Sequence, residues 1–433
     1  MKILYVIHSF PPFHWRGTEV YALELAGAMA ASHEAHVFYL RDDPEARAVT
    51  LEHDAFRDLP VHRARMRINP ADPETYFFHA AQEGAFSELL NSLRPDVVHF
   101  VYYTGGLSLK LPRLAGRSGA RVLLTVTDFS GLCPRGQLLD DEGVRCRGPR
   151  EGLRCVPCLF KQTALTKQPW LDYLLREYAP LKLAPAGSGR ELGLMRRRLD
   201  AVRAAFGQAE LVIYPNANAM RLYHGSGVKA PRERVMDYGI DTAPFREHRK
   251  SAAAFARIGF IGQLLPHKGL HVLARALSGL TGEWKLIIHG SLDDPGAREY
   301  YESLELDPER AEFRGTFPFE RMNRVLEGID VLVAPSLWDE NCPLIVKYAL
   351  ATGTFAVLAD QPGMVADRSG IRRARFFKPG DAEALRDALK EAMERSQAPA
   401  GPALNEALES RAIIDIKDQA AELEKIYKGG AEK

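Results

Sequence analysis

Residues 330–353, DVLVAPSLWDENCPLIVKYALATG, predict a buried strand, a polar turn and a helix in direct succession. Residues 331–334 are apolar without alternation, which is typical of a strand covered on both faces of a parallel sheet. Pro343 suits the first helical turn, and the free amides beside it form an anion site. Glu340 lies just before these amides, so we interpret it as an acceptor for hydroxyl groups. The combination suits a phosphorylated sugar, although an ordinary strand–loop–helix unit of an α/β protein would also fit.

The composition is that of an ordinary globular protein. The 433 residues are 46% hydrophobic and 26% charged, enough for two or three domains. Lys plus Arg (57) nearly balances Asp plus Glu (56), so the charge gives no reason to expect a nucleic-acid partner. The apolar run at residues 3–7 is too short for a signal peptide, and no run approaches the roughly 18 apolar residues of a membrane span. These features predict a cytoplasmic protein with at most peripheral membrane contact.

Apolar runs alternate with helical patterns along most of the chain. The runs that we expect to be strands lie at residues 3–7, 37–40, 96–100, 121–127, 211–214, 258–262, 285–289, 313–317, 331–334 and 354–359. This alternation predicts an α/β protein with doubly wound parallel sheets. We place a first domain at residues 1–243, a linker at 244–255, a second domain at 256–410 and, at 411–433, a C-terminal helix.

Residues 335–360, PSLWDENCPLIVKYALATGTFAVLAD, resemble the donor-site segment of the retaining GT-B glycosyltransferases of family 4. In that family two Glu residues, with seven residues between them, bracket a nucleotide-sugar. The first contacts the donor sugar and is matched by Glu340, whereas the second holds the ribose and is replaced by Tyr348. A phenol offers the ribose only one oxygen, so the ribose is held differently, the donor binds weakly, or the chain is inactive. The resemblance assigns further donor contacts to the turn residues Asn341, Cys342, Pro343 and Leu344.

Two more loops of the second domain match donor-binding loops of the family. Gly262 and Gln263 follow the strand at residues 258–262, and Gln263 stands where an Arg is frequent. Lys268 matches a Lys that meets the donor pyrophosphate, although a surface Lys is the alternative. The missing Arg should weaken phosphate binding without abolishing it. Backbone around Thr316 and Phe317 is the expected contact for the nucleobase.

The first domain carries the residues expected near the acceptor. Gly17, preceded by Arg16, stands where the family has two adjacent glycines. Thr127 occupies the position of a sugar-contacting His in many relatives, and its hydroxyl excludes a general-base role there. Asp128 either orients the acceptor or caps the turn after a strand. We interpret His99 as a structural histidine of the sheet rather than a catalyst.

Four of the five cysteines follow the pattern Cys133-x12-Cys146-x8-Cys155-x2-Cys158. The close pair forms the kind of knuckle that suits tetrahedral Zn²⁺, and two more thiolates complete the shell. Because the loop is rich in Gly, Pro and charge, it buries little apolar surface, and a metal would supply order. We predict structural Zn²⁺, with free thiols or an iron–sulfur cluster as alternatives. A similar cysteine-bearing loop occurs in a subset of the family.

Residues 160–208 predict a helical, basic insertion whose densest patch is at residues 194–199. A solvated helix face is the simplest interpretation. If the acceptor is lipid-linked, the same patch could instead rest on anionic lipid at the inner face of the membrane.

The resemblance implies two Rossmann-like domains facing across a cleft, the C-terminal helix returning to the first domain, and retaining, metal-independent hexosyl transfer. A UDP- or GDP-sugar would donate to a glycan or lipid-linked glycan in cell-surface polysaccharide or glycoconjugate synthesis. Glu340 would hold the sugar hydroxyls, Lys268 and the amides of residues 342–344 would stabilise the diphosphate, and Thr127 would line the sugar pocket. The departing phosphate would accept the acceptor's proton. The alternative is a non-catalytic binding or regulatory subunit, because Tyr348, Thr127 and Gln263 depart from the common pattern.

Overall fold

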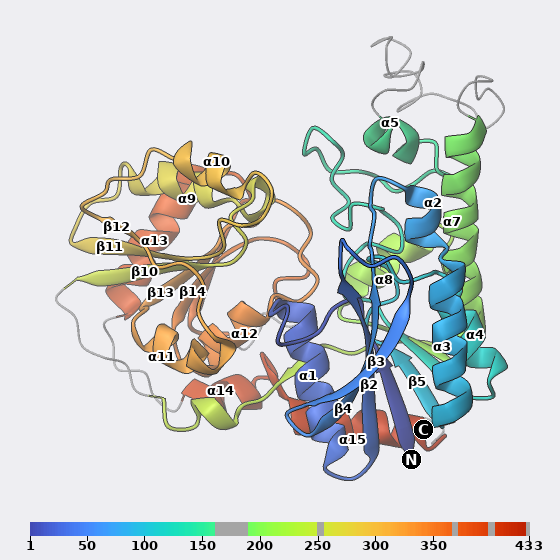
Figure 1. Ribbon diagram of the computed structural model, residues 1–433. Helices are drawn as coiled ribbons and strands as arrows, with labels where there is room; N and C mark the ends of the chain where they lie inside the picture. Colours follow the sequence, from blue (N-terminus) through green and yellow to red (C-terminus); the bar gives the residue numbers. More distant parts are fainter. Residues whose placement is uncertain (161–188, 249–254, 366–370, 397–402, 430–433) are drawn as a thin grey trace. The chain divides into compact units, whose positions relative to one another are not determined.

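The structure is a computed structural model that describes residues 1–160, 189–248, 255–365, 371–396 and 403–429. Contacts divide the chain into unit 1, which is Met1–Met236 with Ala420–Lys433, and unit 2, which is Asp237–Gln419. Each unit is built around one parallel or largely parallel sheet (Figure 1). Most of the predicted basic insertion and part of the predicted linker lie outside the described residues.

Unit 1 contains an eight-stranded sheet of order β3-β4-β2-β1-β5-β6-β7-β8. Its strands are β1 (Lys2–Val6), β2 (Glu34–Asp42), β3 (Thr50–Phe56), β4 (Leu59–Met66), β5 (Val97–Phe100), β6 (Arg121–Thr125), β7 (Leu211–Tyr214) and β8 (Glu233–Val235). Only β3 is antiparallel to its neighbour in this sheet. β1 pairs with β2 on one side and β5 on the other. The carboxyl ends of β1 and β5 therefore flank the topological switch point, where sheets of this type bind ligands.

Helices cover both faces of the unit 1 sheet. They are α1 (Gly17–Ala30), α2 (Pro73–Phe77), α3 (Ala80–Leu93), α4 (Leu111–Arg117), α5 (Cys155–Leu159), α7 (Gly189–Gln208) and α8 (Ala217–Gly225). Helices α3, α4 and α7 lie on one side of the sheet and α1 on the other (Figure 1). The last helix, α15 (Ile416–Tyr427), belongs to unit 1 from Ala420 onward.

His99, on β5, is a structural residue of the unit 1 core, as the sequence analysis predicts. Its side chain is fully buried, Nδ1 lies 2.5 Å from the Tyr427 hydroxyl, and Nε2 lies 2.7 Å from Thr125 Oγ1. Burial lowers the pKa of His99 to about 3, so the imidazole stays neutral. With both ring nitrogens hydrogen-bonded inside the core, His99 ties α15 to the sheet.

Unit 2 contains a six-stranded, fully parallel sheet of order β12-β11-β10-β13-β14-β15. Its strands are β10 (Ala256–Ile261), β11 (Trp284–His289), β12 (Ala311–Phe313), β13 (Val331–Ala334), β14 (Phe355–Ala359) and β15 (Ala374–Phe377). The uninterrupted apolar run predicted as a buried strand is β13, near the centre of the sheet. β10 lies between β11 and β13, so the switch point is flanked by β10 and β13.

The helices of unit 2 also cover both faces of its sheet. They are α9 (Leu270–Leu277), α10 (Ala297–Glu302), α11 (Met322–Glu327), α12 (Leu344–Ala351), α13 (Ala382–Ser396) and α14 (Ala403–Glu409), with short 3₁₀ turns η1 (Ala243–Phe245), η2 (Pro266–Lys268) and η3 (Phe319–Arg321). Helices α9 and α13 pack together on one side, and α11 and α12 on the other (Figure 1). A two-stranded ribbon joins β9 (Gly239–Ile240) and β16 (Ile414–Asp415). Two α/β units with parallel sheets confirm the predicted fold class.

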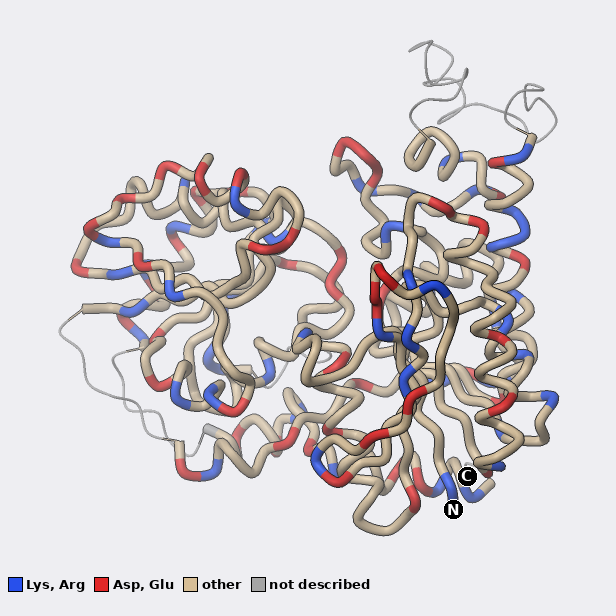
Figure 2. The backbone as a smooth tube through the Cα atoms, in the orientation of Figure 1, with Lys and Arg blue, Asp and Glu red and all other residues tan. Residues whose placement is uncertain are grey.

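The basic patch of the predicted insertion lies on α7, where Figure 2 shows Lys and Arg among acidic and uncharged residues. Its arginines are largely engaged within unit 1. Arg198 is 2% exposed and donates to the carbonyls of Ser130 and Gly131, and Arg197 donates to Glu74 at 2.7 Å. Arg198 therefore has a structural role, because its hydrogen bonds hold the loop after β6. No helix among the described residues is long and apolar enough to cross a bilayer.

Candidate active site

Two loops meet at the switch point of unit 2, one after β10 and one after β13. The first contains η2 and ends at Gly269, whose φ of 77° favours glycine. A Cβ at Gly269 would lie 1.9 Å from the carbonyl oxygen of Pro335, and Leu337 N donates to the His267 carbonyl at 2.8 Å. Only glycine therefore allows the two loops to pack this closely, which explains why Lys268 is followed by Gly269.

Lys268 and Glu340, predicted separately from the two loops, form an ion pair. Lys268 Nζ lies 2.7 Å from Glu340 Oε1, and the Glu340 side chain is almost completely buried. The same oxygen accepts hydrogen bonds from Ser336 Oγ at 2.7 Å and Trp338 Nε1 at 2.8 Å. Burial alone would raise the pKa of Glu340, but the ammonium and these donors outweigh it, and the pKa is lowered. Glu340 is therefore ionised at neutral pH.

The side chain of Trp338 lies between the two loops. Its ring centroid is 4.9 Å from Lys268 Nζ, a cation–π distance, and 5.7 Å from the ring of His267, which meets it edge-on. Burial lowers the pKa of His267 to about 4, so this imidazole is neutral beside the ammonium. From the sequence alone Trp338 has no assigned role, because nothing in its position distinguishes it from a packing residue.

The turn before α12 is fixed by a buried ion pair. Lys347 Nζ lies 2.5 Å from Asp237 Oδ2, and Cys342 Sγ donates to Asp237 Oδ1 at 3.2 Å. Pro343 has an extended backbone and is the N-cap of α12, so the helix begins one residue later than predicted, at Leu344. No side chain caps this end of the helix. The amide end of α12 thus starts at the same turn that carries Glu340 and the buried Asn341.

Tyr348, at the predicted ribose position, lies in an aromatic cluster. It is 2% exposed, and its ring centroid is 5.5 Å from that of Phe245 and 5.7 Å from that of Phe319. The sequence could not show this environment, because both partners come from distant parts of the chain. Tyr348 fills space where a carboxylate would need water or a cation.

The other predicted donor contacts follow neighbouring strands at the same edge of the unit 2 sheet. Gly262 N donates to the His289 carbonyl at 3.0 Å, and Gln263 Nε2 reaches Asp294 Oδ2 at 3.5 Å. Thr316 is exposed, and the half-buried ring of Phe317 meets that of His289 edge-on at 4.9 Å. These loops therefore bring both polar groups and the aromatic ring of Phe317 to this edge of the unit 2 sheet.

Thr127 and Asp128 follow β6 at the carboxyl end of the unit 1 sheet. Asp128 Oδ1 accepts from Ser130 N, and Oδ2 accepts from the Tyr102 hydroxyl, both at 2.7 Å. Burial raises the pKa of Asp128. The turn-capping contact to Ser130 is the alternative that the sequence analysis gave for this residue. Thr127 is half-buried beside it, and Gly17 is exposed at the start of α1.

A second pair of titratable residues at the unit 1 switch point escaped the sequence analysis. His8 follows β1, and its Nε2 lies 3.4 Å from Glu19 Oε1 in the first turn of α1. Glu19 is 2% exposed, and the His8 ring lies 4.2 Å from that of Tyr102. Burial raises the pKa of Glu19 and lowers that of His8 to about 4. Acidic residues are common in first helical turns, so Glu19 carried no distinctive signal.

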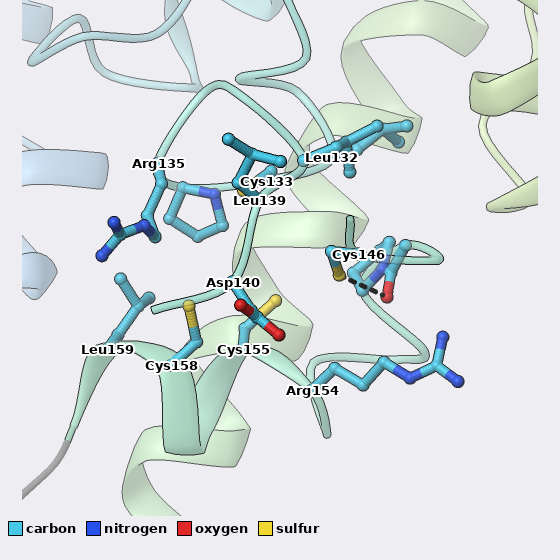
Figure 3. A pocket seen from close by; sticks show the side chains of 14 residues that line it. Leu132, Cys133, Arg135, Leu139, Asp140, Cys146, Arg154, Cys155, Cys158 and Leu159 are labelled. Carbon is cyan, nitrogen blue, oxygen red and sulfur yellow. Dashed lines mark hydrogen bonds between the residues drawn. The ribbon is translucent and has the colours of Figure 1, made fainter. Parts of the chain in front are cut away.

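The four clustered cysteines line one pocket of unit 1 (Figure 3). Cys155 and Cys158 come from α5, whereas Cys133 and Cys146 come from the preceding loop. Cys146 Sγ is directed at the Gly148 carbonyl, 3.5 Å away. Within the described parts of the chain, no group of three or more His, Cys, Asp or Glu side chains is arranged to hold a metal ion. The spacing therefore predicted the shared pocket, but the structure does not support the zinc prediction.

Comparisons with solved structures show the fold. A sucrose-phosphate synthase from Thermosynechococcus elongatus superposes with a TM-score of 0.67 at 15% identity, covering 99% of this chain and 98% of that one. Anabaena HepE in complex with UDP-glucose gives 0.64 at 16% identity, covering 98% and 100%. The lipopolysaccharide outer core galactosyltransferase WaaB gives 0.57 at 14% identity, covering 99% and 100%. These similarities place the chain in the GT-B fold. No curated protein sequence matches the chain.

Two family models match the sequence itself. Residues 16–239 match "Glycosyl transferase 4-like domain", and residues 256–395 match "Glycosyl transferases group 1". The first model alone spans half of the chain and covers most of unit 1. The second covers the sheet of unit 2 and the loops that carry Lys268 and Glu340. The chain therefore belongs to the family 4 glycosyltransferases of the GT-B fold.

Proposed function

We propose that this glycosyltransferase moves a hexose from a nucleotide-sugar to a glycan or lipid-linked glycan with retention of configuration. The observation that carries the proposal is the Lys268–Glu340 pair at the switch point of unit 2, with Nζ 2.7 Å from Oε1. It places a cation for a diphosphate beside a carboxylate for sugar hydroxyls. The open end of α12 adds backbone amides for the same negative charge.

Sugar transfer requires the protein to stabilise the charge of the leaving diphosphate and to orient the donor sugar. As the glycosidic bond to the diphosphate breaks, Lys268 and the amides at residues 342–344 stabilise the negative charge on the leaving group. Glu340 holds the sugar hydroxyls, so the anomeric carbon keeps its position. A leaving phosphate oxygen takes the proton of the acceptor hydroxyl, which attacks from the same face and retains the configuration. No metal ion takes part in this scheme.

We assign the acceptor to unit 1. Asp128 and Thr127 lie at the carboxyl edge of its sheet, where Tyr102 and the His8–Glu19 pair add polar groups. Because burial raises the pKa of both Asp128 and Glu19, this edge favours neutral hydroxyl groups over anions. That preference suits a glycan. Synthesis of a cell-surface polysaccharide or glycoconjugate, in the cytoplasm or at the inner face of the membrane, is the setting that we propose.

The donors to test first are UDP-sugars, then GDP-sugars. Solved GT-B neighbours include HepE with UDP-glucose and a trehalose-6-phosphate protein from E. coli with UDP-2-fluoro glucose. Purified protein is mixed with a panel of nucleotide-sugars, and thermal stabilisation and sugar release are measured. We expect one donor class to raise the melting temperature and to be turned over slowly in the absence of acceptor. No response to any donor would overturn the proposal.

A non-catalytic binding subunit is the second candidate, and the burial of Tyr348 in its aromatic cluster favours it. Without a carboxylate at the ribose, a donor can bind without reaching the geometry of transfer. A nucleotide-sugar that stabilises the protein, combined with no sugar release and no transfer to any glycan acceptor, would identify this candidate. Sugar release sensitive to Glu340→Gln would exclude it.

We propose separately that the four clustered cysteines of unit 1 bind structural Zn²⁺. What supports it is that Cys133, Cys146, Cys155 and Cys158 line one pocket. Ligation would require Cys146 to turn away from the Gly148 carbonyl. Metal analysis of purified protein tests it, with Cys155→Ser/Cys158→Ser as the paired variant. We expect one zinc per chain in the wild type and none in the variant, whereas metal-free wild type with four titratable thiols in this loop would overturn the site.

A further inference from the structure

Glu340 is held through only one of its two carboxylate oxygens. Oε1 accepts from Lys268, Ser336 and Trp338, all within 2.7–2.8 Å. Among the described residues, none donates a hydrogen bond to Oε2. Oε2 is also not among the buried polar atoms of the described residues that lack a partner, so this oxygen is accessible to a water molecule or a ligand while Oε1 is held by the protein.

The three donors to Oε1 differ in what a bound diphosphate would do to them. The Lys268 ammonium is the group that a diphosphate attracts, so donor binding competes with its contact to Glu340. The Ser336 hydroxyl and the Trp338 indole come from the same loop as Glu340 and carry no charge. They therefore keep their hydrogen bonds to Oε1 when Lys268 turns toward the phosphate.

Trp338 contacts both members of the ion pair. Its Nε1 donates to Glu340 at 2.8 Å, while its ring lies 4.9 Å from Lys268 Nζ. The edge-on ring of His267, 5.7 Å away, limits the rotation of the indole. A single side chain thus orients the carboxylate and supports the ammonium.

We propose that Trp338 is a positioning residue of the donor site, which holds Glu340 through Oε1 so that Oε2 alone accepts the hydroxyl of the donor sugar. This inference rests on the proposed function. It assigns two roles to the indole. The N–H supports sugar binding because it holds Glu340, and the ring supports diphosphate binding because it contacts Lys268. The two roles can be separated, because phenylalanine keeps an aromatic ring and lacks the N–H.

The test compares Trp338→Phe with the wild type by calorimetry, using UDP and UDP-glucose, and GDP and GDP-mannose, as paired probes. The sugar contribution is the ratio of the two Kd values within a pair. We expect Trp338→Phe to weaken this contribution about tenfold while leaving nucleotide affinity within about twofold, since one hydrogen bond to a charged group is lost. Ser336→Ala, which removes a second donor to Oε1, should act in the same direction by a smaller factor.

Trp284→Phe is the matched control. Trp284 lies in the same unit, is 7% exposed, and its Nε1 donates to the backbone carbonyl of Leu280 at 3.2 Å. It should leave the sugar contribution unchanged.

An unchanged sugar contribution in Trp338→Phe and Ser336→Ala would overturn the inference while the proposed function stands. Parallel loss of sugar and nucleotide affinity would also overturn it, because that result indicates a disrupted loop. If the wild type binds neither pair of probes, the proposed function and this inference fall together.

Discussion

The switch points of the two sheets have the same topology and opposite electrostatics. In unit 2 the edge holds an ionised pair, Lys268 with Glu340, and the pKa of the carboxyl group is lowered. In unit 1 the edge holds Asp128 and Glu19, whose pKa values burial raises, and His8, whose pKa it lowers. Burial acts on the carboxyl groups of both edges in the direction of a higher pKa. The difference is that the Lys268 ammonium, with the donors Ser336 and Trp338, outweighs burial at Glu340, whereas burial dominates at Asp128.

This difference separates the tasks that the two edges can perform. An edge with an ammonium beside a carboxylate offers a cation to an external diphosphate. An edge whose carboxyl groups have raised pKa values, beside a neutral imidazole, offers hydrogen-bonding partners to hydroxyl groups, whereas an anion would meet buried carboxyl oxygens there. The comparison therefore predicts that mutations in unit 2 change donor binding, whereas mutations in unit 1 change transfer.

The largest effect on turnover is expected from Glu340→Gln. The amide lacks the charge that sugar hydroxyls bind and no longer pairs with Lys268, so sugar release from UDP-glucose should fall about 100-fold, since hydrogen bonds to a charged group contribute about 1.5–3 kcal/mol. Initial rates measure this change. Glu312→Gln, which removes an exposed carboxylate 2.8 Å from Arg314 Nη2, should leave the rate unchanged. Equal rates in both variants would contradict the role of Glu340.

Tyr348→Glu should destabilise unit 2 by about 3 kcal/mol, because a carboxylate in the aromatic cluster must lose water or become neutral. Urea unfolding of the whole chain measures the loss, and Tyr348→Phe should lose less than about 1 kcal/mol, because it keeps the ring. A stable Tyr348→Glu variant with increased UDP affinity would instead show that this position reaches the ribose.

Lys268→Met should weaken UDP binding by about 30-fold, or about 2 kcal/mol, because a charge-assisted contact to the diphosphate is lost while the volume is kept. Calorimetry measures the affinity. Lys285→Met is the control, since Lys285 Nζ also lies over an aromatic ring, 5.6 Å from the centroid of Phe255. A similar loss in the two variants would mean that Lys268 has no specific role.

Asp128→Asn should slow transfer to the acceptor about tenfold and leave UDP affinity unchanged, because this carboxyl group belongs to the edge that we assign to the acceptor. Transfer rates and calorimetry are compared in the same preparation. Asp140→Asn provides a control, because Asp140 Oδ1 also accepts backbone N–H groups in a turn of unit 1. If UDP affinity fell as much as the rate, Asp128 would affect donor binding, and the assignment of separate tasks to the two edges would be wrong.

The smallest effect concerns His99 and pH. Its pKa is about 3 in the folded chain, below the ordinary value of 6.5, so the unfolded chain binds a proton that the folded chain does not. The stability that this neutral imidazole contributes is present above pH 6.5 and is lost as the pH falls toward 3. Between pH 7 and pH 5.5 we expect His99 to contribute about 1 kcal/mol to the loss of stability of the wild type. His99→Gln should lack this component, and identical pH profiles would contradict it.

Local patterns predicted much of the fold and singled out both Lys268 and Glu340, which the structure pairs. The apolar run of β13, the Lys268–Gly269 pair and Glu340 carry their signals within a few residues, because strand burial and helix-start chemistry are local. Trp338 carried no local signal, since its role depends on Lys268, 70 residues earlier in the chain.

Long-range contacts also explain the remaining differences. The environment of Tyr348 comes from Phe245 and Phe319, and the burial of Arg198 comes from the loop after β6. Cysteine spacing predicted that four thiols would share a pocket, but spacing does not determine side-chain torsions, and no ligating arrangement is present among the described residues.

The pairing of Tyr427 with His99 has a consequence for how the protein is made. Unit 1 is built from two segments on either side of unit 2, because Ala420–Lys433 join Met1–Met236. On the ribosome, α15 therefore reaches the unit 1 sheet only after unit 2 has been translated. We expect unit 2 to finish folding before unit 1 in nascent chains, although most of unit 1 is translated first.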